Sequence, residues 1–317
     1  MVVALQNDDA LEPGFSNPRR RQHASRAAAM KEVVLSFGEQ GRLIGIVSLP
    51  DRLDPDSPAV LLPNTGLEHR VGPNRLHVHL SRALADAGFA TLRLDLGGLG
   101  DSIPADGSAD SSRDLSAAMD ILQARGFGDR FAVLGLCSGA HDAHLAMRAD
   151  RRLIAGAFID GYLFPTPRFY LTYLLQRATD PARILRKLLR IVGSNTDGYH
   201  QSPIDLDYFR QPTKTEMQRD LAAFIHRGLI LSYIYTGQIQ HRYNYAGQLE
   251  DAFPELRRYP NAEVRYLLMA DHTFSQATMR SELVDVVVSW MRRCASSAPP
   301  LAPSGKLLWF LTLTLAC

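Results

Sequence analysis

Short apolar runs alternate with segments of helical apolar spacing between about residues 31 and 160, and again from about 228 to 294. A continuous apolar run bounded by turn residues is typical of a strand buried in a parallel sheet. Two further runs, KEVVLSF and RLIGIVSLP, are joined by the short turn GEQG, which predicts an antiparallel pair. The alternation predicts an α/β protein with a mostly parallel central sheet flanked by helices. The predicted parallel strands are PAVLLPN, ATLRLDL, RFAVLGL, LIAGAFID, LILSYIYTG and AEVRYLLMA.

The segments between these strands predict helices. Ser111 or Ser112 is suited to be the N-cap of the helix that runs to about Gln123. The core therefore comprises residues 31–160 and 228–294, with further helices predicted across 76–87, 139–148, 246–252 and 276–293.

The segment from 161 to 227 interrupts this alternation and predicts a helical lid inserted into the core. In DPARILRKLLRIV, Asp180 is suited to cap a helix whose first position is Pro181. One side of this helix is basic and the other is apolar. Two interpretations stay open: a solvated face above a buried one, or a lid whose cations meet an anionic group such as the phosphates of a coenzyme A or carrier-protein thioester. The basic residues are Arg183, Arg186, Lys187 and Arg190.

The two ends of the chain differ in composition from the rest. Residues 1–30 have no apolar run like that of a signal peptide, and we expect a disordered leader. Residues 295–317 join a proline- and serine-rich linker to an apolar stretch, Leu307 to Cys317, which is shorter than the roughly 20 residues that span a bilayer. We therefore expect a tail that packs on the body or frays, in preference to a membrane tether.

The charge and the cysteine content of the chain limit the kinds of partner and the cellular compartment that we expect. Lysine and arginine number 35 against 33 aspartate and glutamate, and a formal charge of +2 does not indicate a nucleic-acid partner. The 3 cysteines lie far apart without CxxC spacing, which argues against a disulfide framework and a zinc site. His141 and His144 could share a helix face, but no third ligand is evident. We expect a cytoplasmic protein without a metal or cofactor.

The stretch GLCSGAHDA, residues 135–143, follows a predicted strand and begins a predicted helix. A strand, the pattern G-x-nucleophile-x-G and a helix form a nucleophile elbow, whose tight turn needs small residues two positions to either side of the nucleophile. Gly135 and Gly139 meet this need around Cys137. Around Ser138 the corresponding position holds Leu136, so Cys137 is the predicted nucleophile.

Residues 31–294 resemble the α/β-hydrolase superfamily, and within it the exosortase-associated and serine-aminopeptidase-like hydrolases. The segments that carry the resemblance are PAVLLPNTGLEHRVGPNRL, LRLDLGGLGDS, GLCSGA and ADHTFSQ. The resemblance implies an α/β-hydrolase fold with a helical lid. It also implies an oxyanion hole made by the N–H of Ser138 and by that of Thr65 or Gly66.

The superfamily places its catalytic histidine after the last strand, where this chain has His272. Most relatives carry the third catalytic residue, an acid, after the strand that follows the lid, but residues 237–248 contain no Asp or Glu. Some members carry the acid one strand earlier, at the position of Asp160. The resemblance therefore implies Asp160 as the acid, with Glu250 or Asp251 in reserve.

His69 and Arg70 lie beside the proposed oxyanion loop. They are candidates for contact with substrate, and the alternative is that they only brace the loop.

A cysteine nucleophile sets the reaction class. A thiol ionises more readily than a hydroxyl, and a helix N-terminus with a neighbouring imidazolium favours the thiolate further. Its attack on a carbonyl gives an acyl-cysteine, which passes to water or to another acceptor. The resemblance favours water as the acceptor and so implies a hydrolase of a small-molecule ester, thioester or lactone. The alternatives are an acyltransferase that uses a coenzyme A or carrier-protein thioester, and a non-catalytic binding protein on a hydrolase scaffold in which Cys137 is a core residue.

Overall fold

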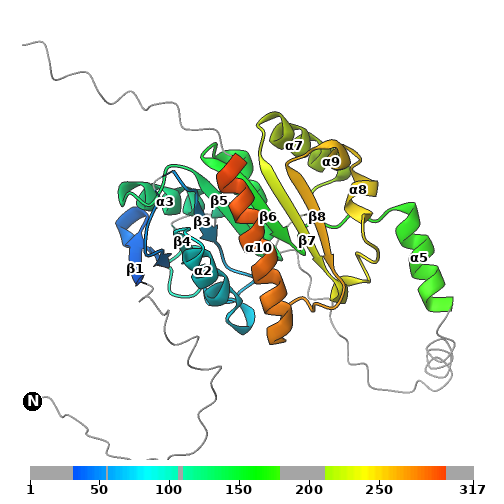
Figure 1. Cartoon of the computed structure of the whole chain (residues 1–317), viewed down its shortest axis with the longest axis horizontal. Helices are drawn as coiled ribbons and strands as arrows, with labels where there is room; N and C mark the ends of the chain where they lie inside the picture. Colours follow the sequence, from blue (N-terminus) through cyan, green and yellow to red (C-terminus); the bar gives the residue numbers. More distant parts are fainter. Residues whose placement is uncertain (1–30, 55, 106–109, 179–210, 298–317) are drawn as a thin grey trace, which may run out of the picture.

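The computed structural model describes residues 31–54, 56–105, 110–178 and 211–297 (Figure 1). Three predicted features lie outside these residues: the leader, the basic helix predicted to contain Arg183 and Arg190, and the apolar tail from Leu307. None of the helices in the described part is both long enough and apolar enough to cross a bilayer.

A single sheet runs through the molecule, with eight strands in the order β1-β2-β4-β3-β5-β6-β7-β8. β1 pairs with β2 and β2 with β4 in antiparallel fashion, and the other neighbouring pairs are parallel. The predicted N-terminal hairpin and the mostly parallel sheet are thus confirmed. The strands are β1 (Lys31–Phe37), β2 (Leu43–Leu49), β3 (Ala59–Leu62), β4 (Thr91–Leu94), β5 (Phe131–Leu136), β6 (Leu153–Ile159), β7 (Ile230–Thr236) and β8 (Ala262–Leu267).

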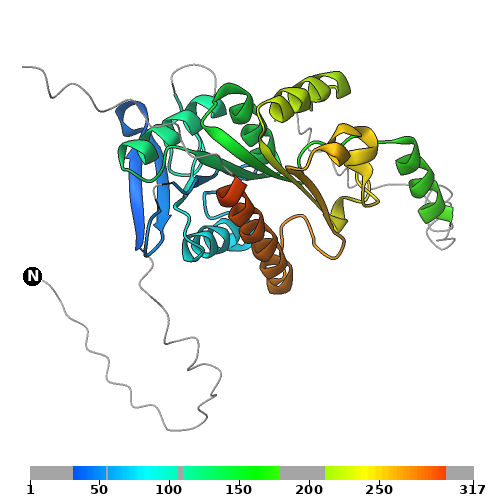
Figure 2. The same cartoon turned by 45° about the horizontal axis from the view of Figure 1, so that its top comes forward.

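Helices cover both faces of the sheet (Figure 2). α2 and α10 pack side by side on one face, whereas α3 and α4 lie together on the other. The described helices are α2 (Leu76–Asp86), α3 (Ser111–Ala124), α4 (Ser138–Ala149), α5 (Pro167–Ala178), α7 (Lys214–His226), α8 (Gln248–Ala252), α9 (Glu255–Arg258) and α10 (Ala277–Ser297), with short 3-10 turns η1 (Glu39–Gly41), η2 (Pro73–Arg75) and η3 (Gly237–Ile239).

Alternate side chains of the central strands enter two apolar cores. In β5, Phe131 and Val133 pack in the core that includes α3, α4 and α7, whereas Leu134 and Leu136 pack in the core that includes α2 and α10. All four side chains are buried. This two-sided burial is why the strand sequences are continuously apolar, and removal of this apolar surface from water is the main force that stabilises the sandwich.

The start of α3 differs from the prediction. Its N-cap is Asp110 and not Ser111 or Ser112, because the Asp110 carboxylate accepts hydrogen bonds from the backbone N–H groups of Ser112 (3.0 Å) and Arg113 (3.2 Å). Asp110 has extended backbone angles, as an N-cap requires, and Ser111 already lies inside the helix.

The segment predicted as a lid contains two described helices with different surroundings. α5 stands apart from the body of the molecule (Figure 1), and Tyr170, Leu171 and Leu174 on it are more than half exposed. α7, in contrast, buries Met217 and Phe224 in the main core. The boundaries of a lid at 161–227 stay a prediction.

Candidate active site

The turn between β5 and α4 holds Cys137 in a strained conformation. Cys137 has φ 58° and ψ −117°, a region that side-chain-bearing residues rarely adopt. A Cβ on Gly135 would lie 2.0 Å from the Gly139 carbonyl oxygen, and one on Gly139 would lie 2.4 Å from that of Asn64. Glycine is therefore required on both sides of Cys137, and the segment forms the predicted strand–turn–helix elbow.

Three predicted residues meet at the carboxyl edge of the sheet. Cys137 directly follows β5, Asp160 directly follows β6, and His272 lies beyond the end of β8. The backbone ladder continues into this edge, since the Cys137 N–H donates to the Ile159 carbonyl (2.9 Å) and the Asp160 N–H to the Ile234 carbonyl (2.9 Å). The sheet thus fixes the first two residues relative to each other.

His272 links the other two side chains. Its Nδ1 lies 2.8 Å from Asp160 Oδ2, and its ring also makes a hydrogen bond with the Cys137 side chain. The bond with the Asp160 carboxylate, followed by that with Cys137, raises the pKa of His272 to about 10 against the opposing effect of burial. The ring is therefore an imidazolium at neutral pH. Its side chain is 31% exposed, so the ring lies at the surface of the site.

The carboxylate of Asp160 is buried and fully bonded. Its Oδ1 accepts the N–H of Thr236 (2.8 Å), and its Oδ2 accepts the Thr236 hydroxyl (2.6 Å) as well as His272. Hydrogen bonds of this number compensate for the loss of water around a buried charge. The backbone of Asp160 also has a positive φ of 47°, a second strained non-glycine residue at this edge.

The loop that carries His272 is held from two sides. Gln238, in η3 directly after β7, accepts the backbone N–H of His272 on its Oε1 at 2.7 Å. Asp271 accepts the N–H groups of Thr273 (3.0 Å) and Ser275 (3.1 Å), so its carboxylate shapes the loop and does not face the imidazole. Gln238 thus stands in the segment where most relatives carry the acid, and it positions the histidine through its backbone.

The reserve acids lie elsewhere. Asp251 accepts the Tyr245 hydroxyl at 2.8 Å and forms an ion pair with Arg257. Glu250 is partly buried near the start of α8, and burial raises its pKa. Within the described residues, Asp160 is the acid that contacts His272.

The predicted oxyanion loop lies against the elbow. The N–H of Gly66 donates to the Ser138 hydroxyl at 2.7 Å, and Thr65 Oγ1 lies 3.3 Å from His77 Nε2. His77 is completely buried, and this burial lowers its pKa to about 4, so the ring is neutral. The loop is thereby tied to α2 through His77 and to α4 through Ser138.

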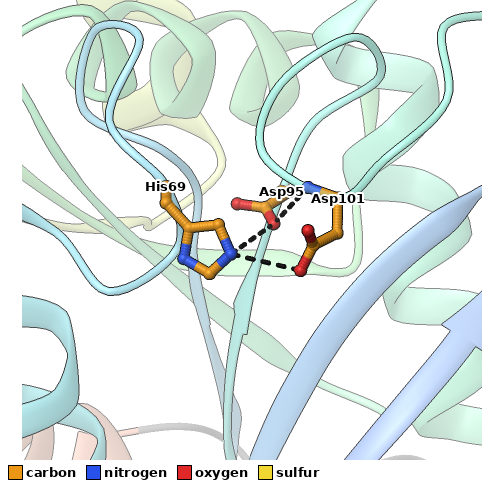
Figure 3. A group of neighbouring side chains, drawn as sticks. All are labelled: His69, Asp95 and Asp101. Carbon is orange, nitrogen blue, oxygen red and sulfur yellow. Dashed lines mark hydrogen bonds and ion pairs between the residues drawn. The ribbon is translucent and has the colours of Figure 1, made fainter.

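His69, Asp95 and Asp101 converge beside this loop (Figure 3). Their ligand atoms lie within 4.8 Å of one another, as they would around a metal ion. Arg70, however, already binds all three: Nη1 lies 2.7 Å from His69 Nε2 and 2.8 Å from Asp101 Oδ2, and it pairs with Asp95. The buried Asp95 also accepts the Asn64 amide (2.9 Å) and the Arg70 N–H (2.6 Å). The guanidinium supplies the positive charge here, and the cluster braces the loop.

His69 and Arg70 were predicted either to contact substrate or to brace the loop. The contacts of Arg70 are those of a bracing residue, and its side chain is only 10% exposed. His69 has a side chain that is 39% exposed, so contact with substrate stays open for it.

Solved structures similar to this one include esterases and other hydrolases. The Pyrococcus furiosus esterase Pf2001 superposes with a TM-score of 0.51 at 13% identity, over 90% of this chain and 99% of that one. A candidate α/β hydrolase from Agrobacterium tumefaciens gives 0.50 at 14% identity, over 86% and 100%. The chain has the α/β-hydrolase fold. A dienelactone hydrolase from Anabaena variabilis gives 0.50 at 15% identity, over 83% and 97%. No protein-family model matches the sequence, and no curated protein does.

In the α/β-hydrolase fold, nucleophile, acid and histidine follow one another in that order along the chain. Cys137, Asp160 and His272 follow one another in this order along the chain, and His272 forms hydrogen bonds with the side chains of the other two. Sequence reasoning missed Thr236 and Gln238, the two residues that hold the acid and the histidine loop. One feature of the sequence could have indicated them: the segment after β7 has no acid, but it has two neutral polar residues. Polar side chains at the carboxyl edge of a parallel sheet often contact the active site.

Proposed function

We propose that the protein is a hydrolase that cleaves a small-molecule ester or thioester, or a lactone, through an acyl-cysteine on Cys137. The observation that carries the proposal is the hydrogen-bonded series Cys137, His272 and Asp160 at a nucleophile elbow. The reaction class is supported by the similar structures, which include an esterase and a dienelactone hydrolase.

The first half-reaction transfers the acyl group to sulfur. Cys137 attacks the carbonyl carbon as a thiolate, and the carbonyl π electrons move onto the oxygen to give a tetrahedral oxyanion. Nδ1 of His272 is bound to Asp160, which leaves Nε2 to carry the proton on the reacting side. Collapse of the intermediate expels an alkoxide or thiolate, which takes that proton. The products are the acyl-cysteine and a free alcohol or thiol.

The second half-reaction returns the enzyme to its starting state. Neutral His272 accepts a proton from water as the water oxygen attacks the acyl-cysteine. The second tetrahedral intermediate expels the Cys137 thiolate and releases a carboxylic acid. Asp160 keeps the ring oriented and stabilises its charged form in both halves.

The charge state of the histidine supports sulfur as the nucleophile. A serine nucleophile needs a neutral imidazole to take its proton, whereas a thiolate is stabilised by an imidazolium. Asp160 makes the largest contribution to the raised pKa of His272, so the charged form of the ring does not depend on Cys137 alone. Cys137 also lies at the N-terminus of α4, whose partial positive charge favours an anion.

Apolar side chains around the site favour an apolar acyl group. Leu67 follows β3, Ile103 follows β4, and Leu268 and Met269 follow β8, so all four leave the edge of the sheet that carries Cys137. Each is more than half exposed. Exposed apolar side chains in the loops at this edge are candidates for contact with an apolar acyl group.

The four segments noted in the sequence support a relationship to the exosortase-associated and serine-aminopeptidase-like hydrolases, which is part of this proposal. A free thiol nucleophile without a disulfide framework fits a reducing, cytoplasmic setting. A coenzyme A or carrier-protein substrate is favoured only by the predicted basic helix, whose residues lie outside the described part of the chain, so the test includes acyl-coenzyme A.

The deciding experiment measures turnover and intact mass together. The protein is incubated with p-nitrophenyl esters of increasing chain length and with matching acyl-coenzyme A. Steady release of product in water, with the highest kcat/KM for longer apolar chains, is the expected result. An acyl adduct that only an added alcohol, amine or thiol discharges would indicate a transferase. Neither adduct nor turnover at any chain length would indicate a binding protein and would overturn the proposal.

Variants then assign the nucleophile. Cys137→Ala is expected to abolish the acyl adduct, whereas Ser138→Ala is expected still to form it on Cys137, at a reduced rate. An adduct that persists in Cys137→Ala and is lost in Ser138→Ala would contradict the assignment. Peptide mapping locates the adduct, because the chain has two further cysteines, Cys294 and Cys317. Cys294 is an internal control, since it is buried in α10 and its pKa is raised to about 12 by that burial.

A further inference from the structure

Ser138, the first residue of α4, contacts the loop that faces the elbow. Its Oγ accepts a hydrogen bond from the backbone N–H of Gly66 at 2.7 Å, between residues 72 positions apart. This N–H was one of the two loop donors predicted for the oxyanion hole, and it is already engaged by a side chain. A substrate oxygen would therefore meet the serine hydroxyl at this point.

Three donors next to Cys137 remain unengaged. Within the described residues, the backbone N–H groups of Thr65 and Ser138 have no protein acceptor in hydrogen-bonding position. The Ser138 hydroxyl uses a lone pair toward Gly66, and its own proton likewise has no acceptor there. A hydroxyl that accepts one hydrogen bond becomes a stronger donor in the next.

We propose that the Ser138 hydroxyl donates a hydrogen bond to the oxyanion formed during attack by Cys137. The Gly66 amide would then act on the oxyanion indirectly, through the hydroxyl to which it donates. The amide and the hydroxyl of Ser138 belong to one residue beside Cys137, and in this proposal both are donors to the same oxyanion. The hydrogen bond from Gly66 holds the serine rotamer, which means that the donor is in place before the negative charge develops. The inference rests on the proposed acyl-cysteine mechanism.

A rival interpretation makes the opposite prediction. If the serine hydroxyl only blocks Gly66, its removal frees a backbone donor, and Ser138→Ala becomes faster than the wild type. If the hydroxyl itself donates, its removal slows acyl transfer. In that case the hydroxyl stands between the Gly66 amide and the reacting oxygen, so the freed amide is too far away to replace it. The sign of the rate change therefore distinguishes the two.

The test compares acyl transfer with a reaction of the same sulfur that forms no oxyanion. Turnover of a p-nitrophenyl ester needs the oxyanion donors, whereas alkylation of Cys137 by iodoacetamide does not. For Ser138→Ala we expect kcat/KM to fall by roughly 10- to 100-fold, since removal of one oxyanion donor generally costs this much or more. The rate of Cys137 alkylation should stay at the wild-type value.

A second, isosteric pair guards against a change in the fold of the elbow. Ser138→Thr keeps the hydroxyl and Ser138→Val has the same shape without it, so Thr is expected to turn over ester 10-fold or more faster than Val at equal alkylation rates. Equal turnover by Ser138→Thr and Ser138→Val, or faster turnover by Ser138→Ala than by the wild type, would overturn the inference. The proposed hydrolase would still hold in that case, provided that the wild type turns over ester. A wild-type protein that alkylates but does not turn over any ester would overturn the proposed function, and this inference with it.

Discussion

Asp160 Oδ2 lies 2.8 Å from His272 Nδ1, although the two residues are 112 positions apart in the sequence. The acid directly follows β6, and the histidine lies beyond β8, with the intervening strand β7 supplying Thr236 to hold the carboxylate. The sheet order alone brings these three segments together, because β6, β7 and β8 are neighbours that run in the same direction.

Replacement of the acid should slow catalysis more than replacement of a reserve acid. Asp160→Asn keeps the shape but removes the charge that orients and stabilises the imidazolium, so we expect kcat/KM for a chromogenic ester to fall by about 100-fold. Glu250→Gln, which changes a carboxylate on α8 that does not contact His272, is the matched control and should stay near the wild-type rate. Equal, small effects of the two would mean that Cys137 and His272 act as a dyad.

The strain at the elbow leads to a prediction about stability. Cys137 has φ 58° and ψ −117°, which glycine adopts freely and alanine does not. We expect both Cys137→Ala and Cys137→Gly to be inactive, with the glycine variant more stable by about 1 kcal/mol. Urea unfolding at pH 7 measures the difference. An alanine variant as stable as the glycine variant would show that the turn relaxes once sulfur is removed.

The order of elements could be predicted from the sequence because each part of the pattern has one physical cause. Buried parallel strands need continuous apolar runs, and the elbow needs glycine at 135 and 139, where a Cβ would collide with backbone atoms. Chain order then selected His272 from among 10 histidines. These are local or topological signals, which a single sequence contains.

The supporting contacts could not be predicted in the same way. Thr236, Gln238 and His77 hold the acid, the histidine loop and the oxyanion loop through contacts between segments that are distant in sequence. Nothing in their local sequence distinguishes them from other polar residues at strand ends or on a helix. The choice between Thr65 and Gly66 also depended on a contact with Ser138 that only the folded chain reveals.

The raised pKa of His272 makes the stability of the fold depend on pH. An unfolded histidine titrates near 6.5, whereas His272 titrates at about 10, chiefly because of Asp160. Its stabilising contribution is thus complete below about pH 6.5 and decreases as the pH rises, until it is lost above about pH 10. The excess unfolding free energy of the wild type over His272→Gln should follow this course in urea titrations between pH 6 and 10.5. In an Asp160→Asn background the decline should be smaller, and an excess that is constant with pH in the wild-type background would contradict the prediction.

Asp142 on α4 should also make the stability of the fold depend on pH, but because of burial and not because of a charged partner. Burial raises its pKa to about 6, against a hydrogen bond from Ser111 that lowers it. The native state therefore keeps a proton that the unfolded chain releases near pH 4, and stability falls as the pH rises from about 4 to 6. Asp142→Asn keeps the shape without the charge. It should gain stability over the wild type across this interval, by on the order of 2 kcal/mol, and hold the gain at higher pH.

The hydrogen bond between Ser111 and Asp142 gives a second test of the pKa of Asp142. Ser111→Ala removes the hydrogen bond that favours the ionised form of Asp142, so the pKa of Asp142 should rise and the loss of stability should extend to higher pH. Unfolding free energies of the wild type, Asp142→Asn and Ser111→Ala are compared at pH 4, 6 and 8. A gain for Asp142→Asn that is already complete at pH 4 would mean that the asparagine improves packing or hydrogen bonding, because at that pH the wild-type native state still carries the proton and has no buried charge to relieve.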